Sequence, residues 1–274
     1  MSAPPQPPAA TASASTPSSS TRAPRSRWWP FSLWLANGLT LGAIVAWALA
    51  ARSLPEFVLP GPLVVAQRLF ALFTDPDFLV HTLASTVRVL VAVMLALVLG
   101  SGLALIQRAV PALDWVLKGG VQPFLNAFPS IGWAILAAIW FTPGHGSIVF
   151  VEVAILVPFC MINVAEGLRQ IDREAIEMAT SFTRRRSRIA LLVGWPLLLP
   201  YVLGALRISY GVAWKIALVA ELLGSSSGLG YLMLRAQGSA DMPTVIAACF
   251  AIVLLFVAGE RLLLDPLARK YGGR

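Results

Sequence analysis

"EMATSFTRRRSRIALLVGWPLLLP", residues 177–200, lies between two strongly apolar regions of the chain. It begins like a soluble helix, continues into a basic cluster and ends in an apolar run that carries Pro196 and Pro200. Charges this dense are costly inside a bilayer. The stretch therefore marks a charged loop between membrane-embedded regions, which we place at about residues 166–188.

The composition indicates a polytopic membrane protein. The 274 residues are 57% hydrophobic and only 12% charged, with a mean hydropathy of +0.76, whereas soluble domains are about a quarter charged. A crossing takes about 20 apolar residues, and six segments meet this length: 32–51, 83–107, 122–141, 147–165, 200–220 and 243–262. The expected fold is an all-α bundle of six transmembrane helices in one domain, residues 31–274.

Prolines and glycines divide the longer apolar runs. Pro143 in "FTPGHGS" predicts a tight turn, so the third and fourth segments should form an antiparallel hairpin. Residues 189–220 are too long for one crossing, and we expect Pro196 and Pro200 to separate an interfacial element from the true span. "PGPLVVAQRLFALF", residues 60–73, predicts an interfacial helix with its apolar face toward the membrane.

The remaining features exclude several classes of function. Residues 2–27 are rich in Pro, Ala, Ser and Thr and carry no acid, which predicts a disordered cytoplasmic tail at 1–30, with a transit peptide as the alternative. Cys160 and Cys249 lie in apolar runs, and His81 and His145 are too few for a metal site. No nucleotide-binding or metalloenzyme motif occurs. We therefore expect no catalytic residue, no metal and no cofactor, and the scattered basic residues argue against nucleic-acid binding.

The distribution of Lys and Arg orients the chain. With the N-terminus inside, fifteen of the 21 basic residues fall on the cytoplasmic side, three outside and three within spans. Such an excess on one side is typical of cytoplasmic segments. Both termini are thus expected in the cytoplasm.

The charged loop has an ordered pattern. It holds four acids and six arginines. Ile171, Ala175, Met178 and Phe182 recur at helical spacing and form one apolar stripe, while the acids come early and the arginines after the helix end. The pattern predicts a helix–turn–helix on the cytoplasmic face, which is a docking surface for a partner.

Four charged residues lie in the outer half of the expected spans: Arg88, Glu152, Lys215 and Glu221. Isolated charges are costly in lipid, so they should line a polar chamber or form structural ion pairs. We favour a structural role for Arg88 and Glu221 and substrate contacts for Glu152 and Lys215. The matching depth of the last two predicts that they pair, directly or through one water, in at least one transport state. Arg207, nearer the cytoplasm, is expected to extend its side chain to the interface.

The charged loop resembles that of binding-protein-dependent ABC importer permeases. Those proteins have Glu-Ala-Ala, three residues, Gly, nine residues, Ile, one residue and Leu-Pro. The corresponding residues here are Glu177, Met178, Ala179, Thr183, Val193, Trp195 and Pro196. Thr183 departs from the family glycine, which leaves open whether the turn needs a positive φ. "HTLASTVRVLVAV", "FPSIGWAILAAIWF" and "LGALRISYGVAWKIALVAELLGSSSGLGYLM" extend the resemblance to the nitrate/sulfonate/taurine/bicarbonate branch.

This resemblance implies a type I importer subunit in a bacterial inner membrane. Its expected partners are separate ABC ATPases, an extracytoplasmic solute-binding protein and a second permease, most simply an identical copy, in the lipid bilayer. The expected coupling residues are Glu174, Glu177, Ala179, Thr183, Arg184, Arg185, Arg186 and Pro196. The alternative is an ion-coupled secondary transporter that uses Glu152, which would leave the helix–turn–helix unexplained.

Overall fold

The computed structural model describes residues 29–271 and divides into two units, 1–46 and 47–274, each of which is described by itself. All regular elements within residues 29–271 are helices, so the all-α class is confirmed. The predicted tail at 1–30 lies outside the described residues except for its last two, which begin helix α1 (Trp29–Ser53). This helix covers the first predicted segment and is about 37 Å long at 1.5 Å per residue.

Four helices of the second unit are long and apolar enough to cross a membrane. They are α3 (Pro76–Ala109); α7 (His145–Gln170); the continuous run of α9 (Arg186–Ile189), η2 (Ala190–Gly194) and α10 (Trp195–Gly224); and the run of α12 (Met242–Gly259), η3 (Glu260–Leu264) and α13 (Asp265–Tyr271). They contain the second, fourth, fifth and sixth predicted segments.

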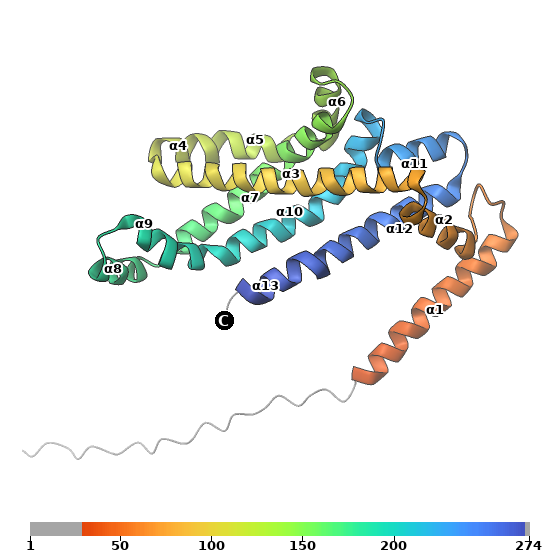
Figure 1. The fold of residues 1–274 in the computed structure, drawn as a ribbon, viewed down its shortest axis with the longest axis horizontal. Coiled ribbons are helices and arrows are strands. Elements are labelled where there is room, and N and C mark those ends of the chain that lie inside the picture. The colour runs from red at the N-terminus through yellow and green to blue at the C-terminus, as the bar shows by residue number, and fades with distance from the viewer. Residues whose placement is uncertain (1–28, 272–274) are drawn as a thin grey trace, which may run out of the picture. The chain divides into compact units, whose positions relative to one another are not determined.

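Helices α3, α7 and α10 form the centre of the second unit (Figure 1). Small side chains allow this close packing: Ala96 on α3 and Ala213 on α10 are fully buried. At Gly100, a Cβ atom would come within 2.6 Å of Cys160 Cβ on α7. The α3–α7 contact therefore requires glycine at this position.

The third predicted span is wrong as a single helix. Residues 111–127 form one helix from α4 (Pro111–Val116), η1 (Leu117–Val121) and α5 (Gln122–Ala127), and α6 (Ser130–Trp140) follows at a bend of 86°. Pro129 causes the break, because it lacks an N–H and forces Phe128 into the extended conformation, at φ −71° and ψ 127°. The described residues thus contain four candidate spans, or five with the bent pair, and the count of six is not confirmed.

The expected division at Pro196 and Pro200 is also wrong, because the helix continues from Arg186 to Gly224 through both prolines. Just before Pro196 it widens into a π turn, in which the Trp195 N–H donates to Ala190 O, five residues earlier. A π turn contains one more residue than an α-helical turn. This residue moves the backbone carbonyl that the proline ring would otherwise contact. The run is therefore one long helix and not an interfacial element followed by a span.

Two shorter helices close one end of the second unit, α2 (Pro62–Thr74) and α11 (Leu229–Gly238). The expected helix at residues 60–73 exists, with Leu63 71% and Phe70 69% exposed. Val65 and Leu72 are buried in a cluster with α11 and α12. At the opposite end, α8 (Arg173–Phe182) and α9 project from the bundle (Figure 1).

Candidate functional site

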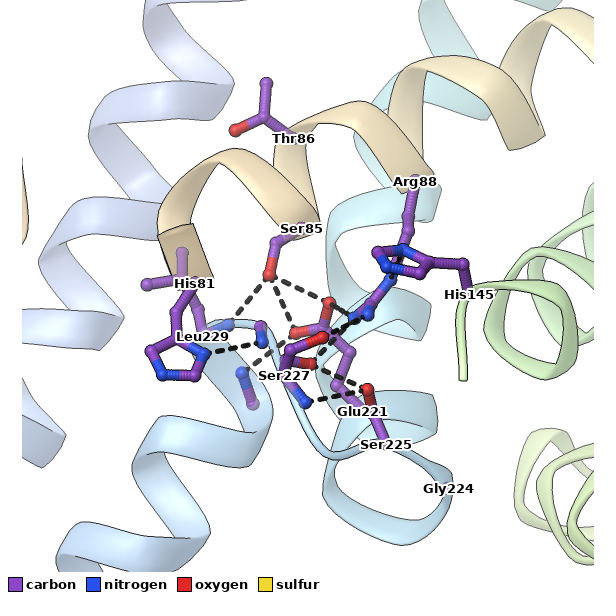
Figure 2. Close-up of polar contacts among 12 residues, drawn as sticks. His81, Ser85, Thr86, Arg88, His145, Glu221, Gly224, Ser225, Ser227 and Leu229 are labelled. Atoms are coloured by element: carbon purple, nitrogen blue, oxygen red, sulfur yellow. Dashed lines mark hydrogen bonds and ion pairs between the residues drawn. The ribbon is translucent and has the colours of Figure 1, made fainter. Parts of the chain in front are cut away.

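A buried ion pair joins α3 to α10. Arg88 and Glu221 are each only 1% exposed, and Arg88 Nη1 lies 2.7 Å from Glu221 Oε1. The guanidinium also donates to Ser227 O at 2.7 Å, to Ser227 Oγ at 2.6 Å and, through Nε, to His145 Nδ1 at 3.0 Å (Figure 2). Every nitrogen of Arg88 therefore has an acceptor, which is the condition under which a buried charge is tolerated.

The Glu221 carboxylate is satisfied from several elements. It accepts hydrogen bonds from Ser85 Oγ at 2.8 Å and from the Gly230 N–H at 2.9 Å, in addition to Arg88 (Figure 2). The loop before α11 passes directly over it at Gly228, which has φ +112° and where any Cβ would overlap the carboxylate. Only glycine fits at position 228, because it adopts a positive φ without strain and has no Cβ to overlap the carboxylate.

The network fastens four elements at one end of the bundle. His81 and Ser85 of α3 accept hydrogen bonds from the Gly228 and Leu229 N–H groups of the loop before α11, and His145 is the first residue of α7. The sequence reading missed both histidines and Ser85. One signal was present: His81, Ser85 and Arg88 lie at i, i+4 and i+7, on one helix face.

The four charged residues expected in the outer half do not form one cluster. Three of them are buried, whereas Lys215 is exposed. Arg88 and Glu221 are paired, in line with their expected structural role. Glu152 on α7 is 0% exposed; neither of its carboxylate oxygens has a hydrogen-bond partner within the described chain, and it interacts electrostatically with Glu221 and Arg88.

Lys215 lies elsewhere, exposed in a groove between α10 and α12. No ion pair within 4.0 Å joins it to Glu152 in this conformation, because the lysine points away from the buried centre where the glutamate lies. Arg207, whose side chain we expect to extend to the interface, is 54% exposed. It pairs with Glu260 at 2.5 Å and with Asp265 at 3.4 Å.

The predicted helix–turn–helix is present. Helix α8 begins at Asp172, whose side chain accepts a hydrogen bond from the Glu174 N–H at 3.0 Å. Ile171, at one end of its apolar stripe, packs against a buried cluster of the bundle, whereas Met178 is 65% and Phe182 is 85% exposed. The charged residues of the expected coupling set are also exposed: Glu174, Glu177, Arg184, Arg185 and Arg186.

The backbone conformation of Thr183 shows whether the turn needs the positive φ that the family glycine allows. Its backbone is extended, at φ −153° and ψ 136°, so a positive φ is not needed at this turn. Its hydroxyl accepts a hydrogen bond from the Arg185 N–H at 3.3 Å, a local turn bond that glycine cannot make. Ala179 is half-buried and Pro196 is exposed.

Metal chemistry finds no support in the described part of the chain. Residues 29–271 contain no group of three or more His, Cys, Asp or Glu side chains placed to hold a metal ion.

Known proteins resemble this chain over most of its length. The family model "Binding-protein-dependent transport system inner membrane component" matches residues 96–265. The taurine transport system permease protein of Escherichia coli (strain K12) is 28% identical over 261 residues, covering 90% of this chain and 92% of that protein. A probable ABC transporter permease protein of Haemophilus influenzae is 30% identical over 218 residues, or 77% and 85% of the two chains. The riboflavin transport system permease protein of Chloroflexus aurantiacus is 33% identical over 204 residues, or 73% and 75%.

Proposed function

Because this chain belongs to the family of binding-protein-dependent transport system inner membrane components, and so is the permease subunit of an ABC importer, we propose that residues 166–188 seat the separate ATPase. A multi-pass inner-membrane permease works with ATPase and substrate-binding partners and is not itself an enzyme. Membership in this family argues against the alternative of an ion-coupled secondary transporter that uses Glu152.

The apolar stripe of α8 carries this proposal. Met178 and Phe182 are large apolar side chains that stand in solvent beside exposed arginines. An amphipathic helix with an uncovered apolar face fits a hydrophobic groove on a partner. Glu177 and the basic cluster at 184–186 are charged residues at the edge of this docking site. Because α9 and η2 connect α8 to α10, movement of the docked helix would be transmitted to α10.

The orientation follows from the same proposal. An ATPase acts in the cytoplasm, so α8 and both termini lie on the cytoplasmic side, in agreement with the excess of Lys and Arg there. The Arg88–Glu221 network is then at the outer end, where the solute arrives from its binding protein. The exposed apolar surfaces of the long helices are available to lipid and to a second permease, and we propose a homodimer.

The solute class is proposed from the relatives. Their names specify taurine, riboflavin and formylaminopyrimidine, all small organic nutrients. For this chain we favour a taurine-like sulfonate or a related small organic acid, with the final choice made by the binding protein.

Two substitutions on opposite faces of α8 test the seat. Phe182→Asp places a charge in the apolar stripe, whereas Thr180→Asp places the same charge on an exposed position about 160° around the helix. We expect Phe182→Asp to lower co-purification of the ATPase and solute uptake at least tenfold, and Thr180→Asp to leave both near the unsubstituted level. Equal behaviour of the two variants would refute the assignment of α8 as the coupling helix.

A further inference from the structure

A groove of about 600 Å³ runs between α10 and α12. Its α10 side presents Arg207, Gly211 and Lys215, which follow one another at four-residue intervals and so lie along one face, with the two cations about 12 Å apart. Gly211 contributes no side chain, and Phe256 of α12 stands 3.7 Å from where a Cβ would be. The groove is therefore apolar at its centre and cationic at both ends.

The two cations differ in their pairing. Arg207 is neutralised by Glu260 and Asp265. Lys215 has neither a hydrogen bond nor an ion pair with any described residue, although it lies nine residues, or about 13 Å, from the end of α10 at Gly224. A charge at that depth is costly in lipid and generally faces a water-filled path or an opposite charge.

A second copy of this chain offers no exposed acid at a comparable depth. All thirteen acids of the sequence lie within residues 56–265, and the two inside the spans at that depth, Glu152 and Glu221, are 0% and 1% exposed. Lipid headgroups lie at the interface, whereas the Lys215 backbone is about 13 Å along the helix axis from the end of α10. The anion that best matches a lysine in this groove is a solute in transit.

We infer that this groove is a binding subsite for an organic anion in transit, with its acid group at Lys215 and its apolar body over Gly211 against Phe256. The inference rests on the proposed import function and adds a substrate class and a location within the membrane. The volume lies within the range of about 300–1,000 Å³ typical of small-molecule sites. A sulfonate or carboxylate on a short carbon skeleton fits this combination of one free cation and apolar walls.

Thiol reactivity in the assembled importer tests the groove without requiring transport. In a chain with Cys160 and Cys249 replaced by Ala, Val253→Cys puts a thiol in the groove, and Leu254→Cys puts one on the same helix outside it; both native side chains are about half exposed. The probes are an anionic ethylsulfonate and a cationic trimethylammonium methanethiosulfonate.

We expect Val253→Cys to react at least tenfold faster with the anionic reagent and to be protected by an excess of ethanesulfonate. Lys215→Gln should abolish the preference and Lys215→Arg should retain it. Leu254→Cys should react with neither reagent, because a thiol in lipid does not form the reactive thiolate. An unreactive Val253→Cys, or one with the same preference after Lys215→Gln, would overturn the subsite.

Uptake of radiolabelled taurine separates this inference from the import function. If the unsubstituted importer takes up taurine, Lys215→Gln should reduce uptake at least tenfold while ATPase co-purification persists; unchanged uptake would reject the subsite alone. Failure of the unsubstituted chain to bind an ATPase would instead refute the import function, and the thiol reactivity would still report on the groove.

Discussion

At the scale of single residues, the central feature is how each membrane-embedded charge is accommodated. Arg88 and Glu221 satisfy one another together with serine, histidine and backbone groups, whereas Arg207 pairs with Glu260 and Asp265, and Lys215 has no ion pair among the described residues. The same residue types therefore have different surroundings in the same bundle. The difference lies in their partners, which the linear sequence does not display.

The buried pair should behave as a unit. Arg88→Met leaves Glu221 buried without its cation, and removing one partner of such a pair costs about 3–5 kcal/mol. The double variant Arg88→Met/Glu221→Met should recover part of that loss. Thermal unfolding of the purified permease measures both.

Arg207→Met is the matched control, because it removes an arginine of α10 that is not buried, with its side chain 54% exposed. Exposed pairs contribute about 0–1 kcal/mol, so its midpoint should move little. A double variant less stable than Arg88→Met would argue against a structural pair.

At the scale of elements, proline positions decide most departures from a simple helix pattern. Each π turn ends two residues before a proline: η1 before Pro123, η2 before Pro196 and η3 before Pro266. A break occurs instead at Pro129, where the preceding residue is extended. Proline thus follows a π turn within a continuous helix at three positions, and at Pro129 it separates α5 from α6.

Glycines on α3 provide a second test at this scale. Gly100→Ala would force Cβ against Cys160 of α7 and should destabilise the protein by about 1–3 kcal/mol, the usual cost of overpacking. Gly102→Ala, two residues away, meets no atom within 4 Å and should be neutral or stabilising by up to about 1 kcal/mol. Urea unfolding of the two variants gives the comparison.

A loss of stability in Gly102→Ala that matched Gly100→Ala would show that the effect comes from α3 itself and not from its contact with α7.

At the scale of the whole molecule, the spacing of apolar residues was enough to locate the long helices and the helix–turn–helix at residues 173–189. Local composition carries that information, since a crossing helix needs little more than length and apolarity. Local composition did not reveal the bend at Pro129 or the continuity through Pro196. A proline can either break a helix or be accommodated within one. Nor did local composition bring His81, His145 and Ser227 to Arg88, since these contacts depend on how distant helices pack.

Orientation can be tested on the same scale. In the chain lacking native cysteines, Thr142→Cys and Ser226→Cys should react with an impermeant maleimide added outside intact cells, as both side chains are exposed in loops at the outer end. Thr180→Cys and Trp115→Cys should react only after the membrane is opened. External labelling at 180 would contradict both the orientation and the proposed ATPase seat.

The Arg88–Glu221 pair also constrains biosynthesis. The two residues are separated by 133 positions, and at about 5–20 residues per second the ribosome needs roughly 7–27 s to make the distance between them. During that interval α3 carries a guanidinium without its carboxylate, and an unpaired charge is costly in lipid. We expect α3 to stay beside the insertion machinery until α10 emerges. A translation product that stops before Glu221 would present an orphan charge by which quality-control proteases distinguish it from the finished permease.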